Sequence, residues 1–427
     1  METAKIVIGA NFGDEGKGLM TDYFAYEAKK QGKPCLVVCH NGGSQRGHTV
    51  VSPTGVRHVF HHFGAGMFAG ADMYLAEEFI VNPIIFNEEM TELGEVSGHF
   101  AGEGNTKEDS AIEDNIKKGN VNKNSIDKAS AEKARADKRF EGTCFVNGKC
   151  LVTTPFDMML NQIAEECRGK DKHGSCGLGI FETIVRSRTD LRLTVGGIAK
   201  MSADEIAKML EKIAAEYFPY RLKELGIDGL PSKWTEILSC RDSIIENYIC
   251  DFYAMLNNME IANDSVIDDY PYVIFEGAQG LILDQSNTAY MPHLTPSNTG
   301  LKNPQKIIGT RKADIEVCYV SRTYMTRHGA GRFDTECPKS DINADIVDMT
   351  NVPNPYQDSL RYGTLDLADL KRRINMDLSA NGCKYKKSIA LTHLNEYPIA
   401  ADRLAEMFGG FGIYLSDGMT RENMLLS

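Results

Sequence analysis

The apolar positions at the start of the chain predict a buried strand followed by a helix. Residues 4–10 form an almost unbroken apolar run, which is typical of a strand covered on both faces. Apolar residues recur at helical spacing between Leu19 and Lys30, and a glycine-rich run separates the two segments. Strand, glycine-rich loop and helix in this order predict an α/β fold, with a large, mostly parallel central sheet flanked by helices.

The same reading places further elements along the chain. Helical spacing runs from Ser202 to about Ala262, with one break at residues 226–231. Residues 272–283 have the pattern of a strand, a tight turn and a return strand. Short apolar runs predict other strands at Cys35–Cys39, Val56–His62, Ile315–Val320 and 388–392, and a strand leading into a helix over 74–84.

The domain organisation follows from two further observations. We find no internal repeat and no clean linker, so we expect one domain over residues 1–427, with residues 202–262 as a helical subregion. Residues 101–140 are rich in charge and poor in large apolar side chains, so they cannot bury much surface. This pattern favours a charged surface insertion, and a lid or an oligomer contact is the alternative.

Composition excludes several classes of protein. The chain has 427 residues, 42% hydrophobic and 25% charged, with a formal net charge of −12. Its apolar runs are too short for a membrane span, and its first residues do not have the pattern of a secretion signal. The acidic balance argues against nucleic-acid binding, which favours a basic face. The 11 cysteines are scattered without Cys-x-x-Cys pairs, so we expect reduced thiols and a cytoplasmic protein.

The glycine-rich loop is the first candidate site. Backbone N–H groups of such a loop, leading into a helix N-terminus, bind phosphate, and Lys17 would add a positive charge. The spacing is longer than in a standard P-loop, and Gly18 stands where Ser or Thr would hold magnesium. Asp14 and Glu15 are unusual inside such a loop, because carboxylates repel phosphate unless they bind metal or move a proton.

A second glycine-rich element covers residues 41–50. It presents His48 directly after Gly47, at a tight turn that a strand follows. A structural histidine is the alternative reading. As a pair, Asp14 could act as general base and His48 as general acid, in a dry site that holds magnesium.

These two elements resemble the adenylosuccinate synthetase family, and the order of further motifs strengthens the resemblance. The similarity covers roughly residues 4–98, 150–190 and 270–427. The matching motifs are Gly13-Asp14-Glu15-Gly16-Lys17-Gly18, Gly47-His48-Thr49-Val50, Phe275-Glu276-Gly277-Ala278-Gln279-Gly280, Thr295-x-Ser297-Asn298-Thr299, Thr326-Arg327-His328-Gly329-Ala330-Gly331, Gly363-x-Leu365-Asp366 and Ser416-x-Gly418-x-Thr420-Arg421.

The resemblance implies a ligase that joins L-aspartate to a 6-oxopurine nucleotide, IMP or dGMP, at the expense of ATP or GTP. Asp14 would remove the N1 proton and bind Mg²⁺ together with the Gly47 carbonyl, and His48 would stabilise charge at O6 during phosphoryl transfer. A homodimer is implied, with Arg186 or Arg188 lent across the interface. The triphosphate would contact Gly13, Glu15, Gly16, Lys17, Gly18, Gly47, Thr49, Asn395, Ser416 and Gly418. The purine nucleotide would contact Asn11, Gln45, Ser175, Cys176, Arg186, Arg188, Gln279 and Thr295, and aspartate would contact Arg327 and Arg361.

Three segments depart from the family pattern. Asn395 stands where the family has Asp, and its mixed donor and acceptor amide predicts a preference for an adenine triphosphate. Residues 354–362 keep only Arg361 of the arginines that would clamp aspartate. Gln45 and Arg46 replace a smaller neutral pair near the purine, so the base pocket could be altered. The presence of Asp14 favours IMP over dGMP, because the phage-associated dGMP branch tends to lose this carboxylate.

Three other classes stay open at this point. A nucleotide-hydrolysing switch would need Ser or Thr after Lys17 and a separate acidic strand end. A metal site on His58, His61 and His62 is disfavoured because successive strand residues point to opposite faces. A catalytically inactive binding protein is disfavoured because Asp14 and His48 are both present.

Overall fold

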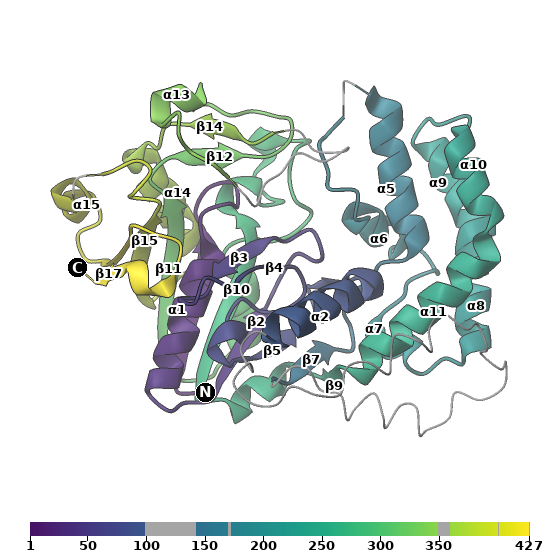
Figure 1. The fold of residues 1–427 in the computed structure, drawn as a ribbon, viewed down its shortest axis with the longest axis horizontal. Helices are drawn as coiled ribbons and strands as arrows, with labels where there is room; N and C mark the ends of the chain where they lie inside the picture. Colours follow the sequence, from purple (N-terminus) through teal and green to yellow (C-terminus); the bar gives the residue numbers. More distant parts are fainter. Residues whose placement is uncertain (99–141, 170–171, 349–358, 400, 427) are drawn as a thin grey trace.

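The fold is organised around one large sheet. The computed structural model describes residues 1–98, 142–169, 172–348, 359–399 and 401–426. The sheet has 10 strands in the order β17-β16-β15-β11-β1-β10-β2-β5-β7-β9, and all neighbours are parallel except β16 and β17 (Figure 1). The strands are β1 (Thr3–Gly9), β2 (Cys35–Cys39), β5 (Asp72–Leu75), β7 (Cys144–Asn147), β9 (Glu260–Ala262), β10 (Tyr272–Gly280), β11 (Asp314–Arg322), β15 (Lys386–Thr392), β16 (Gly412–Ser416) and β17 (Met424–Leu426). The predicted α/β fold with a mostly parallel sheet is confirmed.

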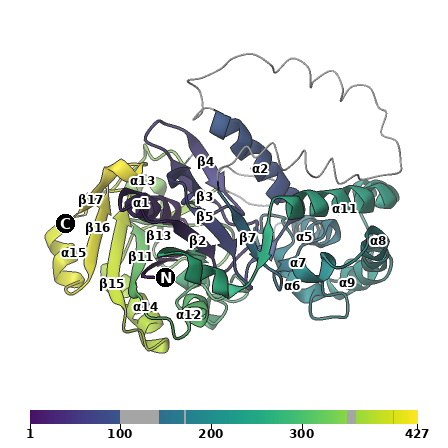
Figure 2. The same cartoon turned by 90° about the horizontal axis from the view of Figure 1, so that it is seen from below.

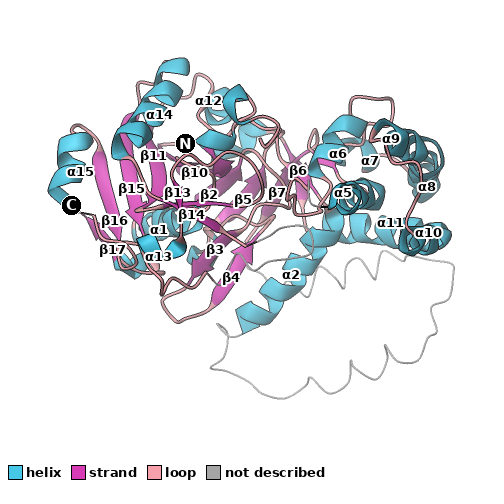
Figure 3. Ribbon diagram, turned by 90° about the horizontal axis from the view of Figure 1, so that it is seen from above, coloured by secondary structure: helices cyan, strands magenta, loops and turns pink. Residues whose placement is uncertain are grey.

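Helices cover both faces of this sheet. Side chains of β1 alternate between two core clusters, with Val7 on one face and Ile6 and Ile8 on the other. Helix α1 (Lys17–Lys30) covers the first face, and α12 (Lys302–Ile308) and α14 (Leu367–Ala380) cover the second (Figures 2 and 3). Burial on both faces explains why the strand sequences are apolar runs rather than alternating patterns.

A group of helices lies beyond the β9 edge of the sheet (Figure 1). Two of its helices begin with capping boxes, Thr154 with Asp157 and Ser202 with Glu205. The predicted helices between Ser202 and Ala262 are present, although the last three residues form β9. The group comprises α5 (Pro155–Arg168), α6 (Ile180–Arg186), α7 (Val195–Ile198), α8 (Ala203–Lys212), a π-helical turn (Ile213–Tyr217), α9 (Phe218–Glu224), α10 (Ser232–Ser239) and α11 (Arg241–Asn257), and α2 (Pro83–Gly98) packs against α11.

Shorter elements accompany the large sheet, among them three small sheets. The strand expected near Val56–His62 is present as β4 (Arg57–Phe60), but it pairs with β3 (His48–Val51) in a separate hairpin. Within the described ranges, the remaining short elements are β6 (Ile80–Val81), β8 (Leu151–Val152), β12 (Met325–Arg327), β13 (Glu336–Cys337), β14 (Arg361–Gly363), α13 (Lys339–Ile342), α15 (Ala401–Met407) and 3₁₀ turns at Met67–Ala69, Asp264–Asp269, Leu281–Leu283, Thr288–Tyr290 and Arg421–Asn423.

One predicted element is wrong. Residues 272–283 do not turn back, because β10 is continuous to Gly280 and a 3₁₀ turn follows it. The glycines at the end of β10 let two backbone segments come close together, and they do not reverse the chain direction. A Cβ at Gly280 would lie 2.3 Å from the Asn11 carbonyl oxygen, so only glycine lets this strand end pass the loop after β1.

Two segments on which the sequence analysis makes predictions fall wholly or partly outside the described residues. Residues 101–140 lie wholly in the undescribed range 99–141, and residues 354–358 lie in the undescribed range 349–358. All 11 cysteines are free. No helix in the described part of the chain has the length and apolar composition of a membrane span.

Histidine burial predicts a specific loss of stability in acid. His40 is fully buried, and neither ring nitrogen has a hydrogen-bond partner among the described residues. Burial lowers the pKa of His40 to about 3, so the unfolded chain binds one more proton than the folded protein between that pH and about 6.5. Stability therefore falls as the pH drops through this window.

In a His40→Leu variant, position 40 no longer binds a proton in the unfolded chain, so it no longer contributes to the pH dependence of stability. Between pH 6 and pH 4, the unfolding free energy of both proteins should fall as the pH drops. The fall should be about 1.4 kcal/mol per pH unit smaller in the variant than in the wild type. Urea unfolding at several pH values measures the difference. Parallel pH profiles for the two proteins would contradict it.

Candidate active site

The loop after β1 lies at the edge of the sheet where parallel strands end. Asn11 Nδ2 donates a hydrogen bond of 2.8 Å to Ser321 Oγ at the end of β11. Thr392 Oγ1, at the end of β15, donates one of 2.8 Å to the Glu15 carbonyl. Segments more than 300 residues apart therefore meet here, at the edge where parallel α/β sheets bind ligands.

Glycines bring this loop against the second predicted element. Gly13 and Gly16 have φ values of 135° and 94°, in the range that favours glycine. A Cβ on Gly18 would lie 2.7 Å from the Thr49 carbonyl oxygen and 3.3 Å from His48 Cβ. Only glycine at this position lets the N-terminus of α1 pass β3, and this contact places His48 beside the loop.

Glu15 and Lys17 form a buried ion pair inside the loop. The Glu15 carboxylate accepts N–H bonds from Asn11 at 3.0 Å and Gly13 at 2.7 Å, and Lys17 Nζ lies 3.3 Å from it. Burial raises the pKa of Glu15, although Lys17 opposes this effect. In this structure two loop amides and the lysine therefore contact a carboxylate of the loop itself. A phosphate would have to displace it or use the amides at the start of α1.

Asp14 is exposed enough to meet a substrate. Its side chain is 24% exposed, and its one ion contact among the described residues is His328 Nε2, at 3.9 Å from Oδ2. Arg322 Nε donates a hydrogen bond to the Asp14 carbonyl, which fixes the backbone rather than the side chain. This arrangement leaves the carboxylate free to accept a proton or bind a cation.

His48 is held by a residue to which the sequence analysis gave no role. Its Nδ1 lies 2.8 Å from Glu276 Oε1, and Arg46 Nη1 lies 2.9 Å from Glu276 Oε2, with all three side chains buried. Burial alone would raise the pKa of Glu276, but Arg46 and His48 lower it to about 2. Burial lowers the pKa of His48 to about 4 despite the carboxylate. An ionised carboxylate only accepts hydrogen bonds, so Nδ1 carries a proton and Nε2 remains for a ligand.

Gln279 lies at the same edge in a strained conformation. Its φ is 63°, in the left-handed region that non-glycine residues rarely adopt. A Cβ on Gly13 would lie 3.1 Å from Gln279 Cα, so the loop and the end of β10 are in contact. Asn41 clamps this strand end through two hydrogen bonds to Ala278, of 3.0 and 2.7 Å. The structure therefore gathers Asp14, His48 and Gln279 around one loop.

Two other predicted purine-nucleotide residues share a cavity. Gln45 and Thr295 both line a cavity of about 260 Å³, and Gln45 Oε1 is buried without a hydrogen-bond partner among the described residues. Lys149 and Arg192 line the same cavity, and no motif marked them in the sequence. Of the Gln45–Arg46 pair, only Gln45 lines this cavity, because the Arg46 side chain is 1% exposed and directed to Glu276.

The prediction that Arg186 could reach across a subunit interface is wrong. Arg186 is fully buried, and it donates to both carboxylate oxygens of Asp157 and to the carbonyls of Leu191 and Val152. These contacts hold α6 against α5, so Arg186 cannot contact a ligand or a second subunit. Arg188 is exposed and remains the candidate.

The turn that carries Ser175 and Cys176 packs against the Arg327 loop. Ser175 Oγ accepts a hydrogen bond of 2.8 Å from Asn161 Nδ2, and burial raises the pKa of Cys176 to about 11. A Cβ on Gly174 would lie 2.7 Å from Gly329 Cα. Neither predicted side chain lines the Gln45–Thr295 cavity among the described residues.

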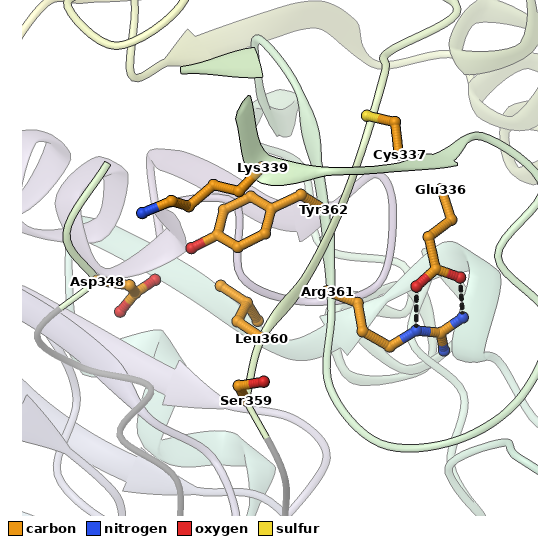
Figure 4. A pocket seen from close by; sticks show the side chains of 8 residues that line it. All are labelled: Glu336, Cys337, Lys339, Asp348, Ser359, Leu360, Arg361 and Tyr362. Atoms are coloured by element: carbon orange, nitrogen blue, oxygen red, sulfur yellow. Dashed lines mark hydrogen bonds and ion pairs between the residues drawn. The ribbon is translucent and has the colours of Figure 1, made fainter. Parts of the chain in front are cut away.

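The two predicted aspartate-binding arginines mainly contact the protein itself. Arg361 forms a double contact with Glu336 (Figure 4). It also donates to the carbonyls of Gly329 and Gly331. It lines an open pocket of about 500 Å³ with Lys339 and Tyr362. Arg327 donates to backbone carbonyls, but its Nε is buried without a partner among the described residues. The guanidinium of Arg327 thus has one unsatisfied donor, which the protein covers in this structure.

The remaining predicted triphosphate residues lie near each other after β15 and β16. Asn395 is exposed on the loop that follows β15. The neighbouring Leu394 N–H donates to the Ser416 carbonyl at 3.1 Å, and Ser416 Oγ donates to the Gly418 carbonyl at 2.9 Å. This pair of loops borders the glycine-rich loop through the Thr392–Glu15 hydrogen bond.

The donor set suits a hard cation with few protein ligands. Among the described residues, no three His, Cys, Asp or Glu side chains come together to hold a metal. The described residues therefore form no metal site on His58, His61 and His62, of which His58 and His62 face Glu89 at 3.6 and 3.8 Å. Asp14 and the Gly47 carbonyl offer oxygen atoms only, which fits Mg²⁺ completed by phosphate oxygens and water.

The fold and this site define an α/β protein with a nucleotide-type loop at the carboxyl edge of a parallel sheet. The chain belongs to the adenylosuccinate synthetase family, because the model of the adenylosuccinate synthetase family matches residues 6–116 and 120–398.

Known proteins of this family are similar over most of the chain. Adenylosuccinate synthetase of Lactobacillus acidophilus is 26% identical over 341 residues, which cover 78% of this chain and 65% of that protein. The match therefore spans just under two thirds of that relative. Fully ligated adenylosuccinate synthetase of Plasmodium falciparum has a similar fold, with a TM-score of 0.67, 14% identity and 99% coverage of both chains. Succinoaminodeoxyadenylate synthetase of cyanophage S-2L, bound to dGMP and dATP, has a TM-score of 0.59, 14% identity, and 100% and 95% coverage.

Proposed function

We propose that the protein is a C–N ligase that joins L-aspartate to C6 of a 6-oxopurine nucleotide, IMP, with hydrolysis of a nucleoside triphosphate. The observation that carries this proposal is the grouping of Asp14, His48 and Gln279 around the loop after β1. Membership of the adenylosuccinate synthetase family supports the reaction type.

The proposed chemistry has two steps. Asp14 accepts the N1 proton of the purine while O6 attacks the γ-phosphorus, and the bond to the β–γ bridging oxygen breaks to release the diphosphate. The amine of aspartate then attacks C6 as the C6–O6 bond breaks, and O6 leaves within inorganic phosphate, which accepts the proton that the amine loses. His48 presents Nε2 where negative charge develops on O6, and Gln279 contacts the purine. Positioning and charge stabilisation supply most of the rate in such a transfer.

Mg²⁺ fits this site as the cofactor. Asp14 and the Gly47 carbonyl would hold it, because both offer the oxygen ligands that this ion prefers. When bound, the ion neutralises charge on the transferred phosphate.

The preferred donor is an adenine triphosphate, and Asn395 is the residue on which this preference depends. An asparagine amide can accept from the 6-amino group and donate to N1 of adenine, whereas a carboxylate accepts from both N1–H and the 2-amino group of guanine. Replacing Asn395 with Asp should shift the kcat/KM ratio of GTP to ATP upward by about tenfold or more. Steady-state kinetics with both donors measure this shift. An unchanged ratio would remove Asn395 from donor recognition.

Two substrate assignments have specific alternatives. dGMP with ATP is the alternative pair, and the dGMP-bound cyanophage structure supports it at the level of the fold. The retained Asp14 favours IMP. L-aspartate is the proposed amine, and Arg327 is the proposed donor to its carboxylate, because its Nε has no hydrogen-bond partner among the described residues.

We also propose a cytoplasmic homodimer in which Arg188 completes the neighbouring subunit's nucleotide site. Arg188→Ala should lower kcat/KM for the purine nucleotide by about 10- to 100-fold without loss of stability, because the side chain is exposed. Mixing this variant with Asp14→Asn should then restore activity, since hybrid dimers contain one intact site. Failure of the mixture to recover activity would place Arg188 in its own subunit's site or outside the site.

The test of the proposed function is phosphate release with IMP or dGMP crossed with ATP or GTP, each with and without L-aspartate. The proposal predicts aspartate-dependent release with IMP and ATP. Release without aspartate would indicate a nucleotide-hydrolysing switch, and turnover on dGMP alone would establish the alternative substrate. Absence of turnover in every mixture would contradict the proposal.

A further inference from the structure

Arg46 is a fully buried cation one residue from the turn that presents His48. Its Nε donates to the His61 carbonyl at 2.9 Å, and its Nη2 donates to the Phe63 carbonyl at 2.5 Å. Its Nη1 lies 2.9 Å from Glu276 Oε2 and 3.0 Å from Cys39 Sγ. Because each guanidinium nitrogen has a protein partner, the side chain is fixed and cannot contact a substrate.

Glu276 divides its two oxygens between Arg46 and His48. Oε2 accepts from Arg46 and, at 3.3 Å, from the Ala65 N–H, while Oε1 lies 2.8 Å from His48 Nδ1. The carboxylate is 0% exposed. A buried carboxylate without a cation is costly, and it would protonate or change partners. Arg46 therefore keeps Glu276 in the form that only accepts hydrogen bonds.

The protonation state of Glu276 determines which ring nitrogen of His48 carries the proton. An ionised Glu276 requires a proton on Nδ1, which leaves Nε2 for a ligand. A protonated Glu276 could instead donate to Nδ1 and move the imidazole proton to Nε2. A partner on one ring nitrogen is the usual means by which proteins fix a histidine tautomer and ring orientation.

We propose that Arg46 is a positioning residue, which acts through Glu276 to fix the ring orientation and the Nδ1–H tautomer of His48. The tautomer can be observed in the ligand-free protein. Its effect on turnover rests on the proposed function. Arg46 makes no contact with the reacting atoms and is not itself a catalytic residue.

The first test observes the His48 tautomer by NMR of ¹⁵N-labelled imidazoles, with the signals assigned by comparison with His48→Asn. The wild type should show Nδ1 protonated and Nε2 unprotonated. Arg46→Met should populate the other tautomer or average the two. The matched control is Arg221→Met, because Arg221 also makes a double contact with a largely buried carboxylate, Glu182, at 2.7 and 3.2 Å. An unchanged His48 signal in Arg46→Met would overturn the proposal.

The second test is kinetic and uses pairs of variants. Arg46→Met should lower kcat by about 10- to 100-fold while KM values change by less than about threefold, and Arg46→Lys should recover part of the loss. The double variant Arg46→Met/Glu276→Gln should be no slower than Glu276→Gln alone, because both changes act on one hydrogen bond. Additive losses would mean that Arg46 only holds the His61 and Phe63 carbonyls, which would overturn the proposal.

Two further controls keep the outcome decisive. If Arg46→Met does not fold, Glu276→Gln replaces it in the NMR test, because a neutral amide can donate as well as accept and should release the fixed tautomer. If the wild-type protein has a fixed His48 tautomer but no ligase activity, the proposed function is rejected. The role of Arg46 in fixing the tautomer would then still stand. A fixed tautomer that survives Glu276→Gln would reject the inference alone.

Discussion

Substituting asparagine for Asp14 should lower kcat by about 10⁴-fold or more, because one change removes both the proposed general base and a proposed ligand of Mg²⁺. General-base catalysis alone contributes typically about 10²- to 10⁴-fold. The fold should be unaffected, since the side chain is 24% exposed and its one ion contact among the described residues is 3.9 Å from His328. Thermal unfolding of wild type and variant checks this second part.

The matched control for Asp14 is Asp334→Asn, an exposed aspartate whose ion pair with Arg332 lies at the surface. Its kcat should stay within about twofold of the wild type, because exposed ion pairs contribute little. An Asp14→Asn variant with activity within tenfold of the wild type would end the assignment of Asp14 as the base. Loss of folding in that variant would show that Asp14 has a structural role that the contacts do not predict.

Substituting asparagine for His48 should lower kcat by about 10²- to 10³-fold with little change in KM. An asparagine amide places a nitrogen near the position of Nδ1, so it can keep the hydrogen bond to Glu276 while Nε2 is lost. Glu276 would remain satisfied, and stability should change little. The activity loss would therefore report on Nε2 itself.

Glutamine at position 48 is the complementary variant. Its longer amide places a polar atom nearer the position of Nε2 and gives up the short contact to Glu276, so it should retain more activity than asparagine and lose more stability. Single-turnover kinetics separate the chemical step from product release in both variants. Equal activities of His48→Asn and the wild type would contradict a role for Nε2.

Local patterns were enough to predict the start of the fold and the loop. The strand, glycine-rich loop and helix at the N-terminus are consecutive, and their periodicities and glycines are visible in fewer than about 30 residues. The continuous β10 was missed for a physical reason. Glycines at its end were read as a reversal, whereas they make room for the Asn11 carbonyl. Spacing alone does not distinguish these two uses of glycine.

The parts of the site that the sequence did not predict depend on contacts between residues far apart along the chain. Glu276 and His48 are 228 positions apart, so the motif that contains Glu276 carried no sign of its partner. The resemblance to the family implies a shared arginine in this segment, and it does not distinguish Arg186 from Arg188. Asp157, 29 positions earlier, makes burial of Arg186 possible by compensating its charge. A carboxylate in a buried apolar strand, such as Glu276 in β10, is the signal that could have revealed a buried partner.

The most direct test of the proposed reaction follows the O6 oxygen. IMP labelled with ¹⁸O at position 6 is incubated with L-aspartate, ATP and Mg²⁺, and the released phosphate is analysed by mass spectrometry. Attack of O6 on the γ-phosphorus predicts one ¹⁸O atom in each phosphate. Phosphate without the label, formed with oxygen from water, would contradict the proposed 6-phosphoryl intermediate.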